Sequence, residues 1–290
     1  LSTAIWLSYS DNNTIDQKLI SDNRYGICCD YAANYNNITN NTALNNEYGV
    51  YFDFSNDNTI ANNNVSDNQY GMYFTGSSSN TIYYNSIINN ANQAYDNTGT
   101  NSWDNGYPSG GNYWSDYNGT DTKYGTDQNY TGADGIGDEH YNSTYGQGIN
   151  GGLSEDNYPL MGPIIDGRFM KPSFRIDSDQ DFITKSWIAP TGNGTVDNPW
   201  VIENYSIDGT GEGYCIYIGN TTDYFEVRNC YLHHASGVGS FPYNYDSGLT
   251  LYTVQNGAIT NNTVSSNNYF GIYLYSSSNN TIANNIASSN

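Results

Sequence analysis

The chain has 290 residues, of which 37% are hydrophobic and 15% aromatic, and its 29 Asp and Glu residues far outnumber its 8 Lys and Arg residues. The net charge of −21 excludes a basic surface for nucleic-acid phosphates or anionic lipid headgroups. Recurring aromatic and β-branched residues favour a folded β protein over a disordered chain, and no apolar run reaches the about 18 residues of a membrane-spanning helix.

An internal repeat fills the first third of the sequence and returns near residue 290. Its consensus is Gly-apolar-x-apolar, polar turn residues, Asn-x-Ile, and an Asn three residues after that Ile. Matching stretches begin at Ala4, Gly26, Gly49, Gly71 and Gly271, and the first four are spaced by 22 or 23 residues. A period of this length without helical periodicity indicates a solenoid of stacked coils.

Each coil predicts three short strands around a narrow core. The alternating pairs Val50/Phe52 and Met72/Phe74 predict one strand with two inward side chains. A second strand is predicted at Ile15, Ile38, Ile60, Ile82 and Ile282, and a third inward position at Leu19, Val65 or Ile87. Because such short strands cannot bury themselves alone, we expect an all-β fold. It would be a right-handed parallel β-helix of 22–23-residue coils with an irregular Gly/Asp-rich segment.

Asn residues recur in two registers of these coils. The first register contains Asn41, Asn63, Asn85, Asn262 and Asn285, and the second contains Asn46, Asn68, Asn90 and Asn267. Asn tolerates the left-handed backbone of tight corners, and identical Asn residues on successive coils can bond to each other as a ladder. We expect a structural Asn ladder rather than a ligand site, with Cys230 at the ladder position of its own coil.

Four parts follow one another along the chain. Residues 1–95 are repeat coils, and residues 96–166 form an acidic Gly-, Asp- and Tyr-rich segment without a clear period. Residues 167–190 form a connector that carries much of the positive charge. Residues 191–290 are coils again, with an extruded loop expected at 235–247.

The acidic segment is the strongest candidate for a metal site. Between Asp96 and Asp156 it has ten carboxylates and one base, Lys123, so the carboxylates would repel each other without a counter-ion. Oxygen ligands among Gly and Asn suit Ca²⁺, although the spacing is not that of an EF-hand. We predict a structural calcium site here, with a solvated acidic loop as the alternative. The ligands would come from Asp116, Asp121, Asp127, Asn129, Asp134 and Asp138.

Other chemistry has weaker support. An enzyme of this fold would need paired carboxylates or a carboxylate beside a base, and none of the few bases in the coils recurs with acids on neighbouring coils. Copper would need clustered His, Met or Cys, whereas His233 and His234 are as compatible with a solvated turn. We expect no enzymatic activity and no copper site. The Cys residues are interpreted as buried hydrophobic side chains, with a Cys215–Cys230 disulfide as the alternative.

Two kinds of surface residue fit an exported protein. Outward Tyr residues could stack on sugars or pack against a neighbouring subunit. Asn-x-Ser/Thr sequons offer glycosylation candidates at Asn37, Asn118, Asn142, Asn193, Asn204 and Asn220.

Three segments carry a resemblance to a known family. The opening "GNGTVDNPWVIENYSIDG", the coil "GIYLYSSSNNTIANN" and the closing "GNYWSDY…DGIGD…DNYPLM" resemble the NosD-like β-helix repeat family of archaeal and bacterial surface proteins. In that family the opening segment comes first, so residues 174–290 resemble the front of one domain and residues 1–166 the back. The resemblance implies the fold and an exported location, but no single activity.

The repeat pattern continues across the two ends of the sequence. Counting from Gly271 past Asn290 into another copy places Ala4 23 residues later, which equals the internal period. We therefore expect a structural, self-assembling extracellular protein, a filament, sheath or surface-layer component that forms a head-to-tail homopolymer. Its assembly edge would contain Ile5, Leu7, Ile15, Ile272, Leu274, Ile282 and Ile286. The alternatives are covalently joined tandem copies, and a protein that binds or cleaves cell-surface glycans.

Overall fold

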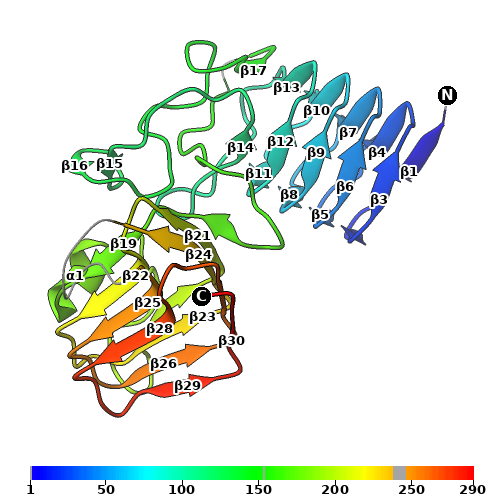
Figure 1. Ribbon diagram of the computed structural model, residues 1–290. Helices are drawn as coiled ribbons and strands as arrows, with labels where there is room; N and C mark the ends of the chain where they lie inside the picture. Colours follow the sequence, from blue (N-terminus) through cyan, green and yellow to red (C-terminus); the bar gives the residue numbers. More distant parts are fainter. Residues whose placement is uncertain (1, 153, 238–245) are drawn as a thin grey trace. The chain divides into compact units, whose positions relative to one another are not determined.

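The structure, a computed structural model, describes residues 2–152, 154–237 and 246–290 (Figure 1). The chain divides into two compact units, Leu1–Ile164 and Ile165–Asn290. Each unit is a stack of coils whose short strands form three parallel sheets along the stack. The expected all-β parallel β-helix is confirmed.

Unit 1 has three parallel sheets that run along the stack. In the first sheet the strand order is β1 (Thr3–Ser8), β4 (Tyr25–Asp30), β7 (Tyr48–Asp53), β10 (Tyr70–Thr75), β13 (Asn92–Asp96) and β17 (Ile149–Asn150). The second contains β2 (Thr14–Asp16), β5 (Asn37–Thr39), β8 (Thr59–Ala61) and β11 (Thr81–Tyr83). The third contains β3 (Leu19–Ser21), β6 (Thr42–Leu44), β9 (Asn64–Ser66), β12 (Ser86–Ile88) and β14 (Tyr113–Trp114).

The core of unit 1 follows from the alternation within these strands. Val50 pairs with Met72, and Phe52 pairs with Phe74 at a ring-centroid distance of 4.8 Å. All four side chains are fully buried. Because the register between coils is one repeat, identical positions stack into continuous columns of apolar side chains, which bury what a single coil could not.

One predicted inward position is wrong by one residue. Leu19 pairs with Thr42 on the outer face and is 76% exposed, whereas Ile20 pairs with Ala43 and lies in the core. The third strand has three residues, and its middle residue points inward. In this coil an apolar side chain stands beside the inward one, so the pattern alone does not distinguish the two.

The corners between strands use left-handed backbone. Asn40 and Asn62, which precede the ladder residues Asn41 and Asn63, have φ values of +56° and +58°. Asn adopts this region more easily than other non-Gly residues because its short side chain can bond locally. In these coils, one Asn therefore forms the corner and the Asn after it forms the ladder.

The acidic segment closes one end of the unit 1 stack. It adds β14 and β17 to two of the sheets and contains the antiparallel pair β15 (Lys123–Tyr124) and β16 (Tyr130–Thr131). Trp103 packs edge-on against Phe74, and Trp114 stacks on Tyr141 at 4.1 Å. These buried rings cover the apolar end of the core and remove it from water.

Unit 2 repeats the architecture with its own first coil. One sheet has the order β18 (Phe169–Met170), β21 (Tyr205–Thr210), β24 (Tyr231–Ser236), β27 (Thr263–Ser265) and β30 (Ile286–Ser288). The second contains β19 (Phe174–Ile176), β22 (Tyr214–Gly219), β25 (Ser247–Tyr252) and β28 (Phe270–Tyr275). The third contains β20 (Trp200–Glu203), β23 (Phe225–Arg228), β26 (Gly257–Thr260) and β29 (Thr281–Ala283).

Residues described from the sequence as a connector form the start of unit 2. They supply β18, β19 and the short helix α1 (Asp179–Thr184). Phe182 of α1 is buried and stacks on Trp200 at 5.6 Å. The helix therefore covers the first coil of this unit. Most of the expected loop at 235–247 lies outside the described residues. Among the described residues, no helix has the length and hydropathy needed to cross a membrane.

Candidate functional site

The open edges of the two stacks are the first candidate surface. Strands β1, β2 and β3 each stand last in their sheets of unit 1, and β28, β29 and β30 each stand last in those of unit 2. Ile5 and Leu7 are partly buried against the unit 1 core. Ile282 is 48% exposed, whereas Ile259, its partner one coil earlier, is fully buried. The last coil thus exposes a position that a following coil would cover.

The remaining predicted edge residues differ in how they face this surface. Ile15 is buried, Ile272 is partly buried and Leu274 is exposed. The structure corrects the prediction that Ile286 belongs to the core edge. Ile286 pairs with Thr263 on the outer face, and Ala287 occupies the register of the buried Val264. Its side chain therefore contributes to the outer surface rather than to the core edge.

Asn ladders join successive coils in both units. The backbone and side-chain amides of Asn41 donate to Oδ1 of Asn63, and those of Asn262 donate to Oδ1 of Asn285. Asn46, Asn68 and Asn90 repeat the arrangement in the second register. In every rung the donors lie on the earlier coil and the acceptor on the later one, so each ladder has a direction.

The structure contains a third ladder, which the sequence did not predict. It contains Asn13, Asn36, Asn58, Asn80 and Asn101. Its signal in the sequence is the Asn of the Asn-x-Ile consensus, which also marks the second strand. The three ladders leave few Asn amides of the core available for a ligand, since these side chains bond to one another.

Cys230 occupies the ladder position in its coil, where its backbone N–H donates to Oδ1 of Asn262 at 2.9 Å. Cys28, Cys29, Cys215 and Cys230 are all free and buried. Burial raises the pKa of Cys230 to about 12, so its thiol stays protonated at neutral pH. These side chains therefore act as small core residues.

The acidic segment uses its carboxylates to hold its own backbone. Asp121 accepts hydrogen bonds from the N–H groups of Asp134 and Gly135, and Asp138 accepts them from the N–H groups of Thr122 and Lys123. Each carboxylate thereby stabilises an irregular turn that has no ladder partner. Repulsion among these acids is offset by N–H dipoles rather than by bases.

The predicted calcium ligands do not form one cluster. Asp116 accepts hydrogen bonds from Gln93, Tyr141 and Gln147, while Asp127 and Asn129 are exposed between β15 and β16. Within the described residues, none of the predicted acids belongs to a group of three convergent acidic or His side chains. Calcium binding stays a prediction, which thermal unfolding with calcium and with a chelator tests.

Tyr residues form two columns on the outer face of the first sheet of unit 1. Tyr25, Tyr48 and Tyr70 stack at centroid distances of 5.1 and 5.0 Å. Tyr51, Tyr73 and Tyr95 stack at 5.5 and 4.4 Å. Each ring face in the middle of a column contacts another ring, so the columns present ring edges rather than the free faces on which sugars stack.

The glycosylation candidates lie on the surface. Asn37, Asn118, Asn193 and Asn220 are exposed, and Asn142 and Asn204 are partly buried. An attached glycan would therefore extend from the surface without entering the core.

Two family models match the chain. Residues 1–119 match the model described as periplasmic copper-binding protein (NosD), and residues 188–290 match the model described as right handed beta helix region. No curated protein and no solved structure matches the chain.

The residues of the first match do not fit a copper site. Residues 1–119 contain no His, and Cys28, Cys29 and Met72 are buried in the core. Burial raises the pKa of Cys28 to about 12, with further increases from Asp30 and Asp53. Copper needs accessible His, Met or ionised Cys ligands, and this stretch offers its sulfur atoms only as core packing.

Proposed function

Because the chain is a NosD-like right-handed β-helix repeat protein, we propose that it is a structural protein of the cell surface whose coils stack head-to-tail onto further copies. The stacked copies would form a filament, sheath or surface layer. The family matches support a periplasmic or surface β-helix protein. The head-to-tail assembly of copies is our proposal.

The observation that carries this proposal is the common direction of the Asn ladders. Donors lie on the earlier coil in unit 1 and in unit 2 alike. The coil of β28, β29 and β30 therefore ends its ladders with the amide groups of Asn285 and Asn290. The coil of β1, β2 and β3 begins its ladders with the side chains of Asn13 and Asn23. A donor edge and an acceptor edge are complementary, and such a heterologous contact propagates instead of closing on itself.

Apolar burial favours the same contact. Because Ile282 is already about half buried, covering it as Ile259 is covered would stabilise the joint by about 0.7–1.5 kcal/mol for this side chain. The edge strands would gain backbone hydrogen bonds of the strand-addition type. The contact uses only interactions that already join coils within each unit.

The experiment measures assembly of the full chain across a range of concentrations by light scattering and negative-stain electron microscopy. We expect fibres from the wild-type chain and their loss in Ile282→Lys, which places a charge in the joint. Val196→Lys is the matched control, because Val196 is exposed in a loop away from the open edge. A discrete monomer at high concentration would overturn the proposal, and the intact mass of native material separates joined tandem copies from separate subunits.

We further propose that the chain has no enzymatic activity. The acidic segment supports this, since Asp121 and Asp138 already bond to backbone amides. Cleavage of acidic polysaccharides, abolished by Asp134→Asn or Asp138→Asn, would contradict the proposal and favour a glycan-cleaving protein.

A further inference from the structure

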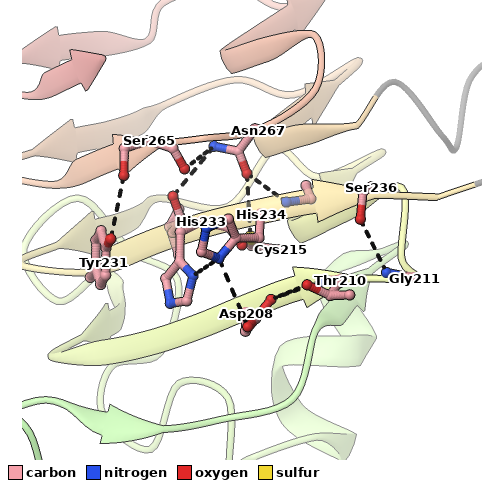
Figure 2. Close-up of polar contacts among 12 residues, drawn as sticks. Asp208, Thr210, Gly211, Cys215, Tyr231, His233, His234, Ser236, Ser265 and Asn267 are labelled. Carbon is pink, nitrogen blue, oxygen red and sulfur yellow. Dashed lines mark hydrogen bonds and ion pairs between the residues drawn. The ribbon is translucent and has the colours of Figure 1, made fainter. Parts of the chain in front are cut away.

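Asp208, His233 and His234 form a polar cluster on the surface of unit 2, outside the ladders and the open edges (Figure 2). Their potential ligand atoms all lie within 4.8 Å of one another. Asp208 belongs to β21 and both His residues belong to β24, the parallel strand beside it. The sequence alone is as compatible with a solvated turn at the two His residues as with a metal site. Both His residues lie far from Asp208 along the chain.

The backbone brings the two imidazoles to the same side of the strand. Asp208 pairs with His233, but the next pair is Thr210 with Ser236, so β24 carries one extra residue at this point. His234 has φ +57°, a left-handed conformation. Neighbouring side chains normally alternate between the faces of a strand, and a bulge of this kind changes their direction. As a result, Nδ1 of His233 and Nδ1 of His234 are 2.8 Å apart.

Surrounding contacts orient all three side chains. Oδ1 of Asp208 accepts hydrogen bonds from the backbone N–H and the hydroxyl of Thr210, at 3.0 and 2.6 Å. Its other oxygen, Oδ2, lies 3.9 Å from Nδ1 of His234. The His233 ring stacks on Tyr231 at 4.3 Å. One carboxylate oxygen and two imidazole nitrogens are therefore held close together at a solvent-accessible place.

The surroundings of the cluster lower the pKa values of both His233 and Asp208. Burial lowers the pKa of His233, and His234 lowers it further against the opposing effect of Asp208. Partial burial opposes ionisation of Asp208, but hydrogen bonds from Thr210 and the nearby His residues outweigh it and lower its pKa.

We propose that Asp208, His233 and His234 bind a divalent transition-metal ion, with Cu²⁺ bound more tightly than Zn²⁺. Imidazole nitrogens favour these ions, whereas Ca²⁺ and Mg²⁺ prefer sites made of oxygen ligands. The two Nδ1 atoms lie 2.8 Å apart, close enough to bind the same ion. For a given site of nitrogen and oxygen ligands, the affinity among divalent first-row metals is highest for Cu²⁺.

The chain provides its own reference for the test. It has three His residues, and the third, His140, lies in unit 1 beside Glu155 at 3.1 Å. We would titrate the full chain, carrying no His tag, with Cu²⁺ and record imidazole nitrogen signals by NMR. Paramagnetic broadening should affect His233 and His234 at the first equivalent and spare His140. Equal broadening of all three signals, or none at one equivalent, would overturn the proposal.

A substitution that preserves the corner tests the ligands by calorimetry. Ser266 occupies the same corner of the next coil with φ +58°, so His234→Ser keeps a side chain that this backbone accepts. We expect His234→Ser to lower the Cu²⁺ affinity by more than the about 10–100-fold typical of outer-shell changes, and His140→Ala to leave it unchanged. Circular dichroism checks that the β-helix is retained. Unchanged affinity in folded His234→Ser, or equal displacement of Cu²⁺ by Ca²⁺, would refute the site.

Discussion

The backbone and side-chain amides of Asn63 both donate to one acceptor, Oδ1 of Asn85 on the next coil, at 3.0 and 2.9 Å. The Nδ2 group of Asn63 also donates back to the carbonyl of Ile38 on the preceding coil, at 2.8 Å. One buried side chain thus joins three coils. A buried amide is favourable only when it is fully bonded, and the repeat satisfies this by placing the same residue on every coil.

Removing a ladder side chain should be costly. Asn63→Ala leaves the N–H of Asn41 without its acceptor and the carbonyl of Ile38 without its donor. Since each buried unpaired group costs about 1–3 kcal/mol, we expect the free energy of unfolding to fall by at least about 2 kcal/mol. Urea unfolding measures the change. Asn64→Ala, one residue away on the exposed side of β9, is the control and should have little effect.

The Tyr columns should stabilise unit 1 through ring contact rather than through their hydroxyl groups. Tyr73 stacks on Tyr51 and Tyr95 and meets Tyr48 and Tyr70 edge-on. Each aromatic pair contributes about 0.5–1.5 kcal/mol beyond the buried area. We expect Tyr73→Leu to lower the midpoint of thermal unfolding and Tyr73→Phe to leave it nearly unchanged. A larger effect of the Phe variant would mean that the hydroxyl carries the contribution.

A pH dependence of stability should arise from Asp156. This residue is fully buried, and burial raises its pKa to about 7 although N–H groups of Asn112, Trp114 and Tyr158 oppose the shift. A pKa above the unfolded value means that the folded state binds the proton more tightly. The stability from this group is therefore complete below about pH 4 and is lost as the pH rises through about 7.

Asp156→Asn should remove that part of the pH dependence. Urea unfolding at several pH values between 4 and 8 gives the slope for the wild-type chain and the variant. Asp127→Asn makes the same side-chain substitution at an exposed position and should keep the wild-type slope. Parallel curves for Asp156→Asn and the wild-type chain would show that the pKa of Asp156 is not raised.

The coils were predictable from the sequence because their side-chain pattern repeats with the backbone. Val50, Phe52 and Ile60 could be placed in the core from spacing alone, since each coil applies the same constraint to the same position. Leu19 and Ile286 were misplaced where two apolar residues stand side by side in a three-residue strand. Neighbouring coils resolve that ambiguity only once the register is known.

The irregular parts were less predictable because their contacts do not follow the period. Asp156 reaches the indole of Trp114 across 42 residues, and no local pattern signals that pair. The cluster of Asp208, His233 and His234 depends on a one-residue shift between β21 and β24. The sequence contains the three residues but not the shift that brings them together.

The Gly that opens the coils at residues 26, 49, 71 and 271 should be intolerant of any side chain. A Cβ added at Gly49 would lie 2.7 Å from the carbonyl oxygen of Gly71 and 2.9 Å from Nδ2 of Asn68. Neither neighbour can withdraw, because one is backbone and the other is a ladder amide. Gly49→Ala should lower the free energy of unfolding by about 1–3 kcal/mol through overpacking, measured by urea unfolding. Gly106→Asn is the control, since an added Cβ meets nothing within 4 Å there and Asn accepts its φ of +68°. Equal stability of the two variants would show that the close approach at Gly49 relaxes without cost.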